Sequence, residues 1–182
     1  LERHIDSAEI AQQRSGLRIL GKIPLITADE PMDGTKARFV RKLLGGGAVE
    51  HRRTSALVSA HSHGSRVVEA YRSLRTVLQF VDGSSGPHTI LVTSAGSGHG
   101  KTTTAANLAI TFAASGERVL LVDADMRKPR MHELFDLRIE GGLREVLAGE
   151  IDLEPAVHRS TIPGLDILTA GARVQNPTEL LA

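Results

Sequence analysis

The sequence has 182 residues, a formal net charge of +1 and 41% hydrophobic residues, as expected for one α/β domain with an appendage. It contains no cysteine, which excludes a disulfide framework and a thiolate metal site. No apolar run is long enough for a membrane helix, and no signal-peptide pattern is present at Leu1. Because the chain starts without Met and stops inside an expected helix, we expect a fragment whose flanking membrane segments are not included.

Charge is unevenly distributed along the chain. Residues 1–81 hold 13 Lys and Arg against 8 Asp and Glu, whereas residues 82–182 hold 9 against 13. Two interpretations of the basic surplus remain open: contact with an anionic membrane surface, at about 1 kcal/mol per base, or a solvated linker. No nucleic-acid partner is expected, because five aromatic residues are too few for a stacking platform. The basic residues considered for membrane contact are Lys36, Arg38, Arg41, Lys42, Arg52 and Arg53.

The first part of the chain lacks long regular patterns. A short apolar stretch over residues 17–26 is broken by glycine and proline, and Gly45–Gly47 and His61–Gly64 are typical of linkers. We therefore divide the chain into an approach segment, residues 1–64, and a folded domain, residues 65–182.

Regular patterns begin after the approach segment. The spacing of Val67, Tyr71, Leu74 and Leu78 predicts a helix over residues 65–81 with one apolar stripe. Beyond it, strand and helix patterns alternate, which predicts an α/β fold with a mostly parallel sheet and helices on both faces. The expected strands cover residues 88–93, 118–122 and 165–168; the expected helices cover 101–115, capped by Gly116, 143–148, and a last one opened by Asn176 and Pro177.

The strongest motif is the glycine-rich stretch Ala95–Thr102, which lies between an expected strand and an expected helix, as a P-loop does. Its glycines allow backbone N–H groups to turn toward a phosphate, and the helix N-terminus adds unpaired donors. We expect Lys101 to reach the β- and γ-phosphates of ATP and Thr102 to bind Mg²⁺. The predicted nucleotide-binding residues are Gly96, Ser97, Gly98, His99, Gly100, Lys101, Thr102 and Thr103.

This loop departs from the P-loop pattern at its first position, where Ala95 replaces glycine. Alanine adopts positive φ at a cost that glycine avoids, so we expect Gly96 and Gly98 to provide the turn. An unrelated glycine-rich turn is the alternative. It is disfavoured because the strand, the loop, Gly100-Lys101-Thr102 and the helix all follow in the required order.

The second motif places Asp123 and Asp125 directly after the apolar run Val119–Val122. In a parallel sheet, the carboxyl end of this strand lies at the edge where a P-loop opens. Either carboxylate suits Mg²⁺ or its waters, and one of the two also suits a base toward an attacking hydroxyl. Arg127 and Lys128 suit phosphate charge. A helix N-cap with ordinary turn charges is the alternative interpretation.

The third motif is Glu69-x-x-Arg72-x-x-Arg75 on the first expected helix of the domain. Glu69 and Arg72 project away from the apolar stripe, and Arg75 lies at its margin. This charged face can meet another subunit. Pairing within the helix at i, i+3, at a few tenths of a kcal/mol, is the alternative.

Together the three motifs resemble the bacterial tyrosine kinases (BY-kinases) that accompany capsule and exopolysaccharide export. The resemblance runs from about Glu69 to Leu181 and includes the Gly141-Gly142-Leu143 and Asn176–Leu181 stretches. The approach segment is similar, more loosely, to the family's stretch between the last membrane helix and the kinase domain, with Leu20–Pro24 its most similar phrase.

The resemblance implies ATP- and Mg²⁺-dependent autophosphorylation on tyrosine between subunits of a ring, at the cytoplasmic face of the cell membrane. It implies phosphate binding by Lys101 and Mg²⁺ binding by Thr102 and Asp123. It also implies that Asp125 either assists the metal or acts as base toward the tyrosine hydroxyl. The implied partners are other copies of the chain and a membrane-anchored polysaccharide co-polymerase region or activator. The implied subunit contacts are Glu69, Arg72 and Arg75.

Two family features are missing from these residues. A further apolar strand ending in Asp, the Walker B strand, should follow the last helix, and a C-terminal tyrosine cluster should receive the phosphate. The one tyrosine, Tyr71, is expected to pack in the core of its helix. The 182 residues alone are therefore not expected to complete the kinase cycle.

Two other functions remain as alternatives. A partitioning or septum-positioning ATPase shares the P-loop lineage but carries an extra lysine near the start of the loop, where this chain has Ala95 and Gly96. A non-catalytic P-loop regulator of a membrane polysaccharide machine is disfavoured by the intact Gly100-Lys101-Thr102 and by both aspartates.

Overall fold

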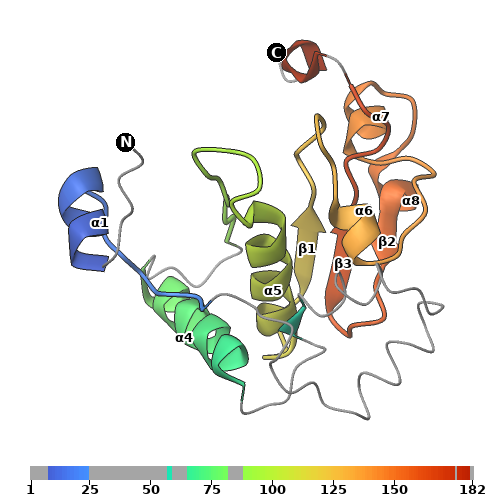
Figure 1. The fold of residues 1–182 in the computed structure, drawn as a ribbon. Helices are drawn as coiled ribbons and strands as arrows, with labels where there is room; N and C mark the ends of the chain where they lie inside the picture. The colour runs from blue at the N-terminus through green and yellow to red at the C-terminus, as the bar shows by residue number, and fades with distance from the viewer. Residues whose placement is uncertain (1–7, 25–56, 59–64, 82–87, 175, 181–182) are drawn as a thin grey trace, which may run out of the picture.

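The structure, a computed structural model, describes residues 8–24, 57–58, 65–81, 88–174 and 176–180 (Figure 1). A short helix, α1 (Ala8–Ser15), comes first and is not predicted by the sequence. Of the residues that follow it, Ile23 packs on the hydrophobic core and Gly21 lies close to Leu74. The basic residues from Lys36 to Arg53 and the histidines at 61 and 63 lie outside the described residues.

Helix α4 (Arg66–Val81) confirms the helix expected over residues 65–81. Val67 and Tyr71 are fully buried, at 0% and 1% exposure. Burial decreases along the stripe, since Leu74 and Leu78 are half-buried and Phe80 is exposed. The expectation that Tyr71 packs in the core is confirmed.

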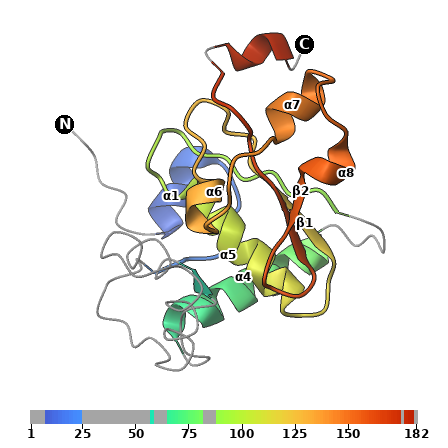
Figure 2. The same cartoon turned by 90° about the vertical axis from the view of Figure 1, so that its right-hand side faces the viewer.

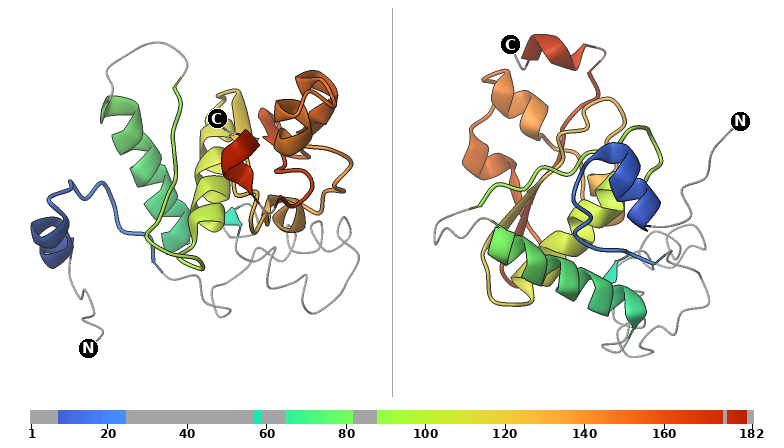
Figure 3. Two further views of the ribbon diagram at one scale, coloured as in Figure 1. Left: turned by 90° about the horizontal axis from the view of Figure 1, so that it is seen from above. Right: turned by 90° about the vertical axis from the view of Figure 1, so that its left-hand side faces the viewer.

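Helix α5 (Lys101–Ala113) follows the glycine-rich loop and has more buried residues than any other described helix or strand. It packs against the sheet on one side and lies alongside α4 on the other (Figure 3). It ends two residues before the expected boundary. Gly116, with φ of 94°, provides the predicted turn after its C-terminus.

Within the residues that the structure describes, the sheet has three strands in the order β1-β3-β2. β1 (Val119–Val122) pairs with β3 (Leu165–Leu168) in parallel, in the register Val119 to Leu165, as the sequence predicts. β2 (Val157–Arg159) pairs antiparallel with β3 and is not predicted. Only five residues connect β2 to β3, and so short a connection permits only antiparallel pairing. The mixed sheet with its helices is an α/β P-loop fold.

The remaining helices are short. They are α6 (Met131–Leu134), α7 (Leu143–Leu147), which confirms the helix expected at 143–148, and α8 (Leu153–Ala156). Figure 2 views the sheet close to edge-on, with α5 on one side and α8 on the other. The helix expected to open at Asn176 and Pro177 is a 3-10 helix, Pro177–Leu180, in the described residues.

One expected strand is wrong. Residues 88–93 form no strand, and Ile90 and Leu91 are 43% and 84% exposed. A strand needs a hydrogen-bonded neighbour, and none of the described strands pairs with this segment. The outward-facing Leu120 and Val122 of β1 are likewise 48% and 41% exposed.

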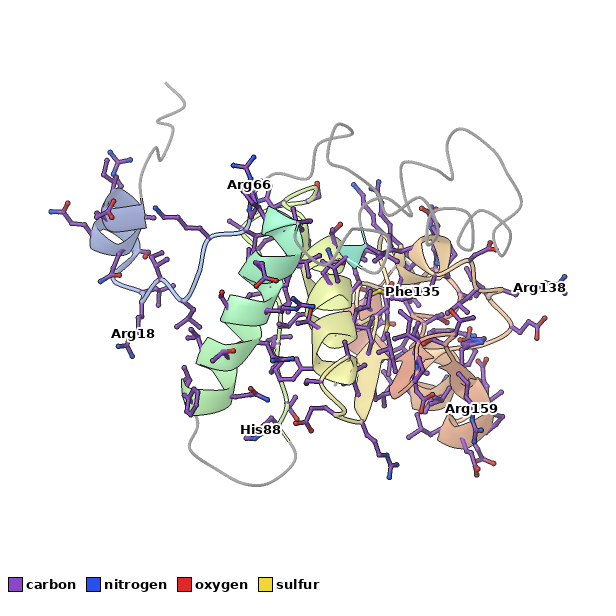
Figure 4. The ribbon with its side chains drawn as sticks, turned by 90° about the horizontal axis from the view of Figure 1, so that it is seen from below. Arg18, Arg66, His88, Phe135, Arg138 and Arg159 are labelled. Carbon is purple, nitrogen blue, oxygen red and sulfur yellow. The ribbon has the colours of Figure 1, made fainter. Side chains whose placement is uncertain are left out.

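Side chains gather between α4, α5 and the sheet, whereas the labelled Arg18, Arg66, Arg138 and Arg159 point outward (Figure 4). No helix within the described ranges has the length and apolar character that crossing a bilayer requires.

Candidate functional site

The P-loop and the acidic loop lie at the same end of the sheet. α5 runs opposite to β1, so the helix begins at the end where the strand stops (Figure 1). Lys101 is the first residue of α5, and Asp123 directly follows β1. Asp123 N also donates to Leu168 O at 2.9 Å, which extends the ladder by one residue. Both motifs therefore lie at the same end of the sheet, which is the arrangement that the sequence predicts.

The backbone of the P-loop turns at glycines. Gly98 and Gly100 have φ of 79° and 81°, and Gly100 is the N-cap of α5 without a side-chain cap. Gly98 therefore supplies the turn as expected, but Gly96 does not, because it has no positive φ. Ala95 also has none, so its departure from the P-loop pattern costs no strain.

Gly96 serves another purpose, which is close packing. A Cβ at this position would lie 3.0 Å from the imidazole Cε1 of His99, so the ring rests against the Gly96 backbone. Gly96 O accepts hydrogen bonds from Ser94 Oγ at 2.7 Å and from Lys101 Nζ at 3.4 Å. The Lys101 ammonium is thus folded back over its own loop by a long bond, which a phosphate oxygen can replace.

Asp123 is fixed by backbone donors. It is 4% exposed; its Oδ1 accepts from Asp125 N at 3.1 Å, and its Oδ2 accepts from Arg130 N at 3.2 Å and Met131 N at 3.0 Å. The carboxylate therefore holds the acidic loop in shape and supports the start of α6. Asp123 therefore has a structural role, but it is not the helix N-cap of the alternative interpretation, because Arg130 occupies that position of α6. Each carboxylate oxygen also keeps lone-pair capacity for a metal-bound water.

Asp125 is more accessible than Asp123. It is half-buried, and the bond recorded for its side chain joins Oδ1 to Lys128 N at 3.0 Å. Arg127 is exposed beside it, while Met126 is 1% exposed and holds the loop on the body of the protein. Of the two aspartates, Asp125 is therefore the one whose side chain is accessible to a ligand.

The charged face of α4 makes two kinds of contact. Arg72 NH1 binds Glu69 Oε1 at 2.6 Å, which is the pairing within the helix that spacing alone foresees. Arg75 NH1 instead donates to Thr111 O on α5 at 3.2 Å. Arg75 thereby ties α4 to the P-loop helix, a role that the sequence does not predict.

Sequence reasoning also misses a charged cluster around Glu145. Its Oε1 accepts from Ala172 N at 3.1 Å and from Arg144 NH1 at 3.2 Å, and Arg144 binds Glu150 as well. Burial opposes ionisation of Glu145, but the donated N–H groups and the guanidinium outweigh it, so the pKa of Glu145 lies below its usual range. The cluster ties α7 to the loop after β3. The sequence signal is Gly171, where an added Cβ would collide with Glu145 Oε2.

Within the described ranges, no group of three or more His, Asp or Glu side chains gathers to hold a metal. The described residues at this edge of the sheet therefore do not form a closed metal-binding cage. Mg²⁺ is usually bound by one or two carboxylates, a hydroxyl, waters and substrate phosphates. The oxygen donors Thr102, Asp123 and Asp125 fit that pattern.

Comparison with known proteins agrees with this arrangement. Residues 90–165 match the CobQ/CobB/MinD/ParA nucleotide binding domain. The chain is 37% identical over 170 residues to a putative tyrosine-protein kinase, EpsB, of Ralstonia nicotianae, covering 93% of this chain but 21% of EpsB. It is 46% identical over 114 residues to the tyrosine-protein kinase YwqD of Bacillus subtilis, covering 63% of this chain and 48% of YwqD. The chain thus spans about a fifth to a half of the length of these relatives.

Solved structures cover nearly the whole chain. The BceF tyrosine kinase domain matches with a TM-score of 0.75 at 31% identity, over 98% of this chain and 67% of that domain. The kinase domain of the Escherichia coli tyrosine kinase Etk matches with a TM-score of 0.75 at 29% identity, over 96% of this chain and 64% of that domain. With its P-loop and its acidic strand end at one sheet edge, the chain belongs to the bacterial tyrosine kinase family.

Proposed function

We propose that this chain is the nucleotide-binding part of an ATP- and Mg²⁺-dependent protein tyrosine autokinase that regulates capsule or exopolysaccharide synthesis and export. The observation that carries the proposal is the common position of the glycine-rich loop and the acidic loop at one end of the sheet in a chain of this family.

The glycine-rich loop would bind the phosphates of ATP. Its backbone N–H groups and the uncapped N-terminus of α5 favour an anion. Lys101, released from Gly96 O, would place its ammonium on the β- and γ-phosphates. The residues assigned to this binding are Gly96, Ser97, Gly98, His99, Gly100, Lys101, Thr102 and Thr103.

Mg²⁺ would be held by oxygen donors. Thr102 would supply its hydroxyl, Asp125 its carboxylate, and Asp123 would bind through metal-bound water while its backbone contacts keep the loop in shape. When bound, the ion neutralises charge on the β- and γ-phosphates.

The transfer itself needs a tyrosine hydroxyl in line with the γ-phosphate. If Mg²⁺ is held by Thr102 and Asp123 without Asp125, Asp125 would accept the proton of that hydroxyl as the hydroxyl oxygen bonds to phosphorus and the bond to the ADP oxygen breaks. Arg127 would stabilise charge on the transferred group. Tyr71 is 1% exposed and therefore unsuited as the acceptor, so the acceptor would be a tyrosine outside these residues.

The resemblance further supports a ring of subunits at the cytoplasmic face of the membrane, in contact with a polysaccharide co-polymerase region or an activator. Glu69, Arg72 and Arg75 would contribute the subunit contact. To make this contact, Arg75 would either leave Thr111 O or use its other N–H groups. One of these groups, Nε, is buried and has no hydrogen-bond partner in the described part of the chain.

The test is phosphotyrosine formation by the full-length gene product. Immunoblotting after incubation with Mg-ATP is expected to show phosphotyrosine in the wild type and in Lys22→Met, an exposed lysine of the approach segment. Lys101→Met is expected to abolish the signal. Equal signals in all three proteins, or no signal in any, would contradict the kinase assignment.

A further inference from the structure

Two residues of the approach segment lie inside the folded domain. Leu57 and Val58 are 5% and 7% exposed and belong to the same hydrophobic cluster as Tyr71 of α4 and Ala106 of α5. Figure 1 shows this short piece, drawn in teal, beside α5. The sequence places both residues in a linker, so their burial indicates a specific docking site.

A buried polar contact joins the docked segment to α5. Val58 N donates to Asn107 Oδ1 at 2.8 Å, and Asn107, in the middle of α5, is 0% exposed. A buried amide N–H is costly to leave unpaired, so this bond selects one position of the segment on the helix. The apolar side chains of Leu57 and Val58 supply the burial around it.

Docking supports the part of α5 that follows the P-loop. The first turn, residues 101–105, is only half-buried, whereas residues 106–111 are buried. Asn107 lies six residues after Lys101, roughly 9 Å along the helix axis. The second tie to α5, from Arg75 to Thr111 O, lies about one turn farther along the helix. Of these two ties, the one made by the approach segment is nearer to the P-loop.

We propose that Leu57–Val58 is a docking plug that couples the approach segment to the P-loop helix through Asn107. Undocking of the plug loosens the first turn of α5 and lowers affinity for nucleotide, and bound nucleotide strengthens docking in return, because such coupling is reciprocal. The nucleotide part of this inference rests on the proposed function, whereas docking and its effect on α5 do not.

Amide hydrogen exchange in the nucleotide-free chain tests the plug directly. The probes are the amide of Val58 and the amide of Thr104, which bonds to Gly100 O at 2.8 Å in the first turn of α5. Leu57→Ala is expected to accelerate exchange of both amides by roughly tenfold or more. Leu17→Ala, the same change at a 70% exposed position of the approach segment, is expected to leave both unchanged. Asn107→Ala is expected to accelerate exchange of the Val58 amide in the same way. Because Asn107 is a core residue, Asn107→Ala can fail to fold, and in that case the result with Leu57→Ala decides.

Calorimetry with Mg-ATP supplies the second measurement. Leu57→Ala is expected to weaken binding several-fold against Leu17→Ala, and saturating Mg-ATP is expected to slow Val58 exchange by the same factor. The inference is overturned if wild-type Val58 exchanges like an unstructured amide, or if Thr104 does not respond to Leu57→Ala. Failure of the wild type to bind Mg-ATP would instead count against the proposed function, and the exchange of Thr104 would still decide whether the plug acts on α5.

Discussion

Lys101→Met is expected to weaken Mg-ATP binding to this chain by roughly 10- to 100-fold, the usual effect of losing a hydrogen bond between charged groups. Methionine keeps the apolar stem of the side chain but removes the ammonium that now contacts Gly96 O. Stability should change little, because that contact is 3.4 Å long and only half-buried. Isothermal titration calorimetry measures the affinity, and urea unfolding measures the stability.

Lys22→Met is the matched control for this change, because Lys22 is exposed and belongs to the approach segment. It is expected to bind Mg-ATP as the wild type does. Equal affinity of the wild type and Lys101→Met would mean that the lysine does not contact phosphate, and the P-loop assignment would then be untenable.

Asp123→Ala is expected to lower the free energy of unfolding by about 2–5 kcal/mol, because three backbone N–H groups lose their acceptor at a position that is 4% exposed. Asp125→Ala is expected to cost less than about 1 kcal/mol, since its recorded contact is one bond at an accessible loop. Urea denaturation measures both values. The two carboxylates, one residue apart in sequence, should therefore separate into a structural and an accessible one.

The same pair can be compared for Mg²⁺ dependence of ATP binding. Asp125→Ala is expected to reduce the gain in ATP affinity that Mg²⁺ provides, while the fold persists.

The stability comparison has its own contradicting outcome. If Asp123→Ala is as stable as Asp125→Ala, then the backbone contacts of Asp123 do not hold the loop. In that case the acidic loop must owe its shape to other contacts, such as the burial of Met126.

Much of the fold follows from local patterns. The apolar stripe from Val67 to Leu78 suffices to predict α4, and the apolar runs suffice to predict β1 and β3, because each element buries one continuous set of side chains. By contrast, β2, α6 and α8 have three or four residues each and depend on contacts with neighbours such as β3. Such short elements show no periodicity from which they could be predicted.

The segment 88–93 shows the opposite error. Its apolar run resembles a buried strand, but pattern describes only what a segment prefers to bury, not whether a partner is present. Leu91 in this segment and Leu120 of β1 both belong to apolar runs, yet both are exposed.

The site follows from sequence in part. The order of strand, glycine-rich loop and Lys101 predicts the P-loop, and parallel pairing predicts its meeting with Asp123. Sequence cannot separate a metal ligand from a carboxylate that accepts backbone N–H groups, because both require an aspartate after a strand. It also cannot foresee Arg75 on Thr111 O, since that contact depends on how α4 crosses α5.

The central claim is that the P-loop and the acidic loop form one nucleotide site. Titration of the isotopically labelled chain with Mg-ATP, followed by amide NMR shifts, tests it most directly. The account predicts that the amides of Gly96 to Thr103 and those of Asp123 to Lys128 shift together, with one common dissociation constant. Shifts confined to one of these loops, or found in neither, would contradict it.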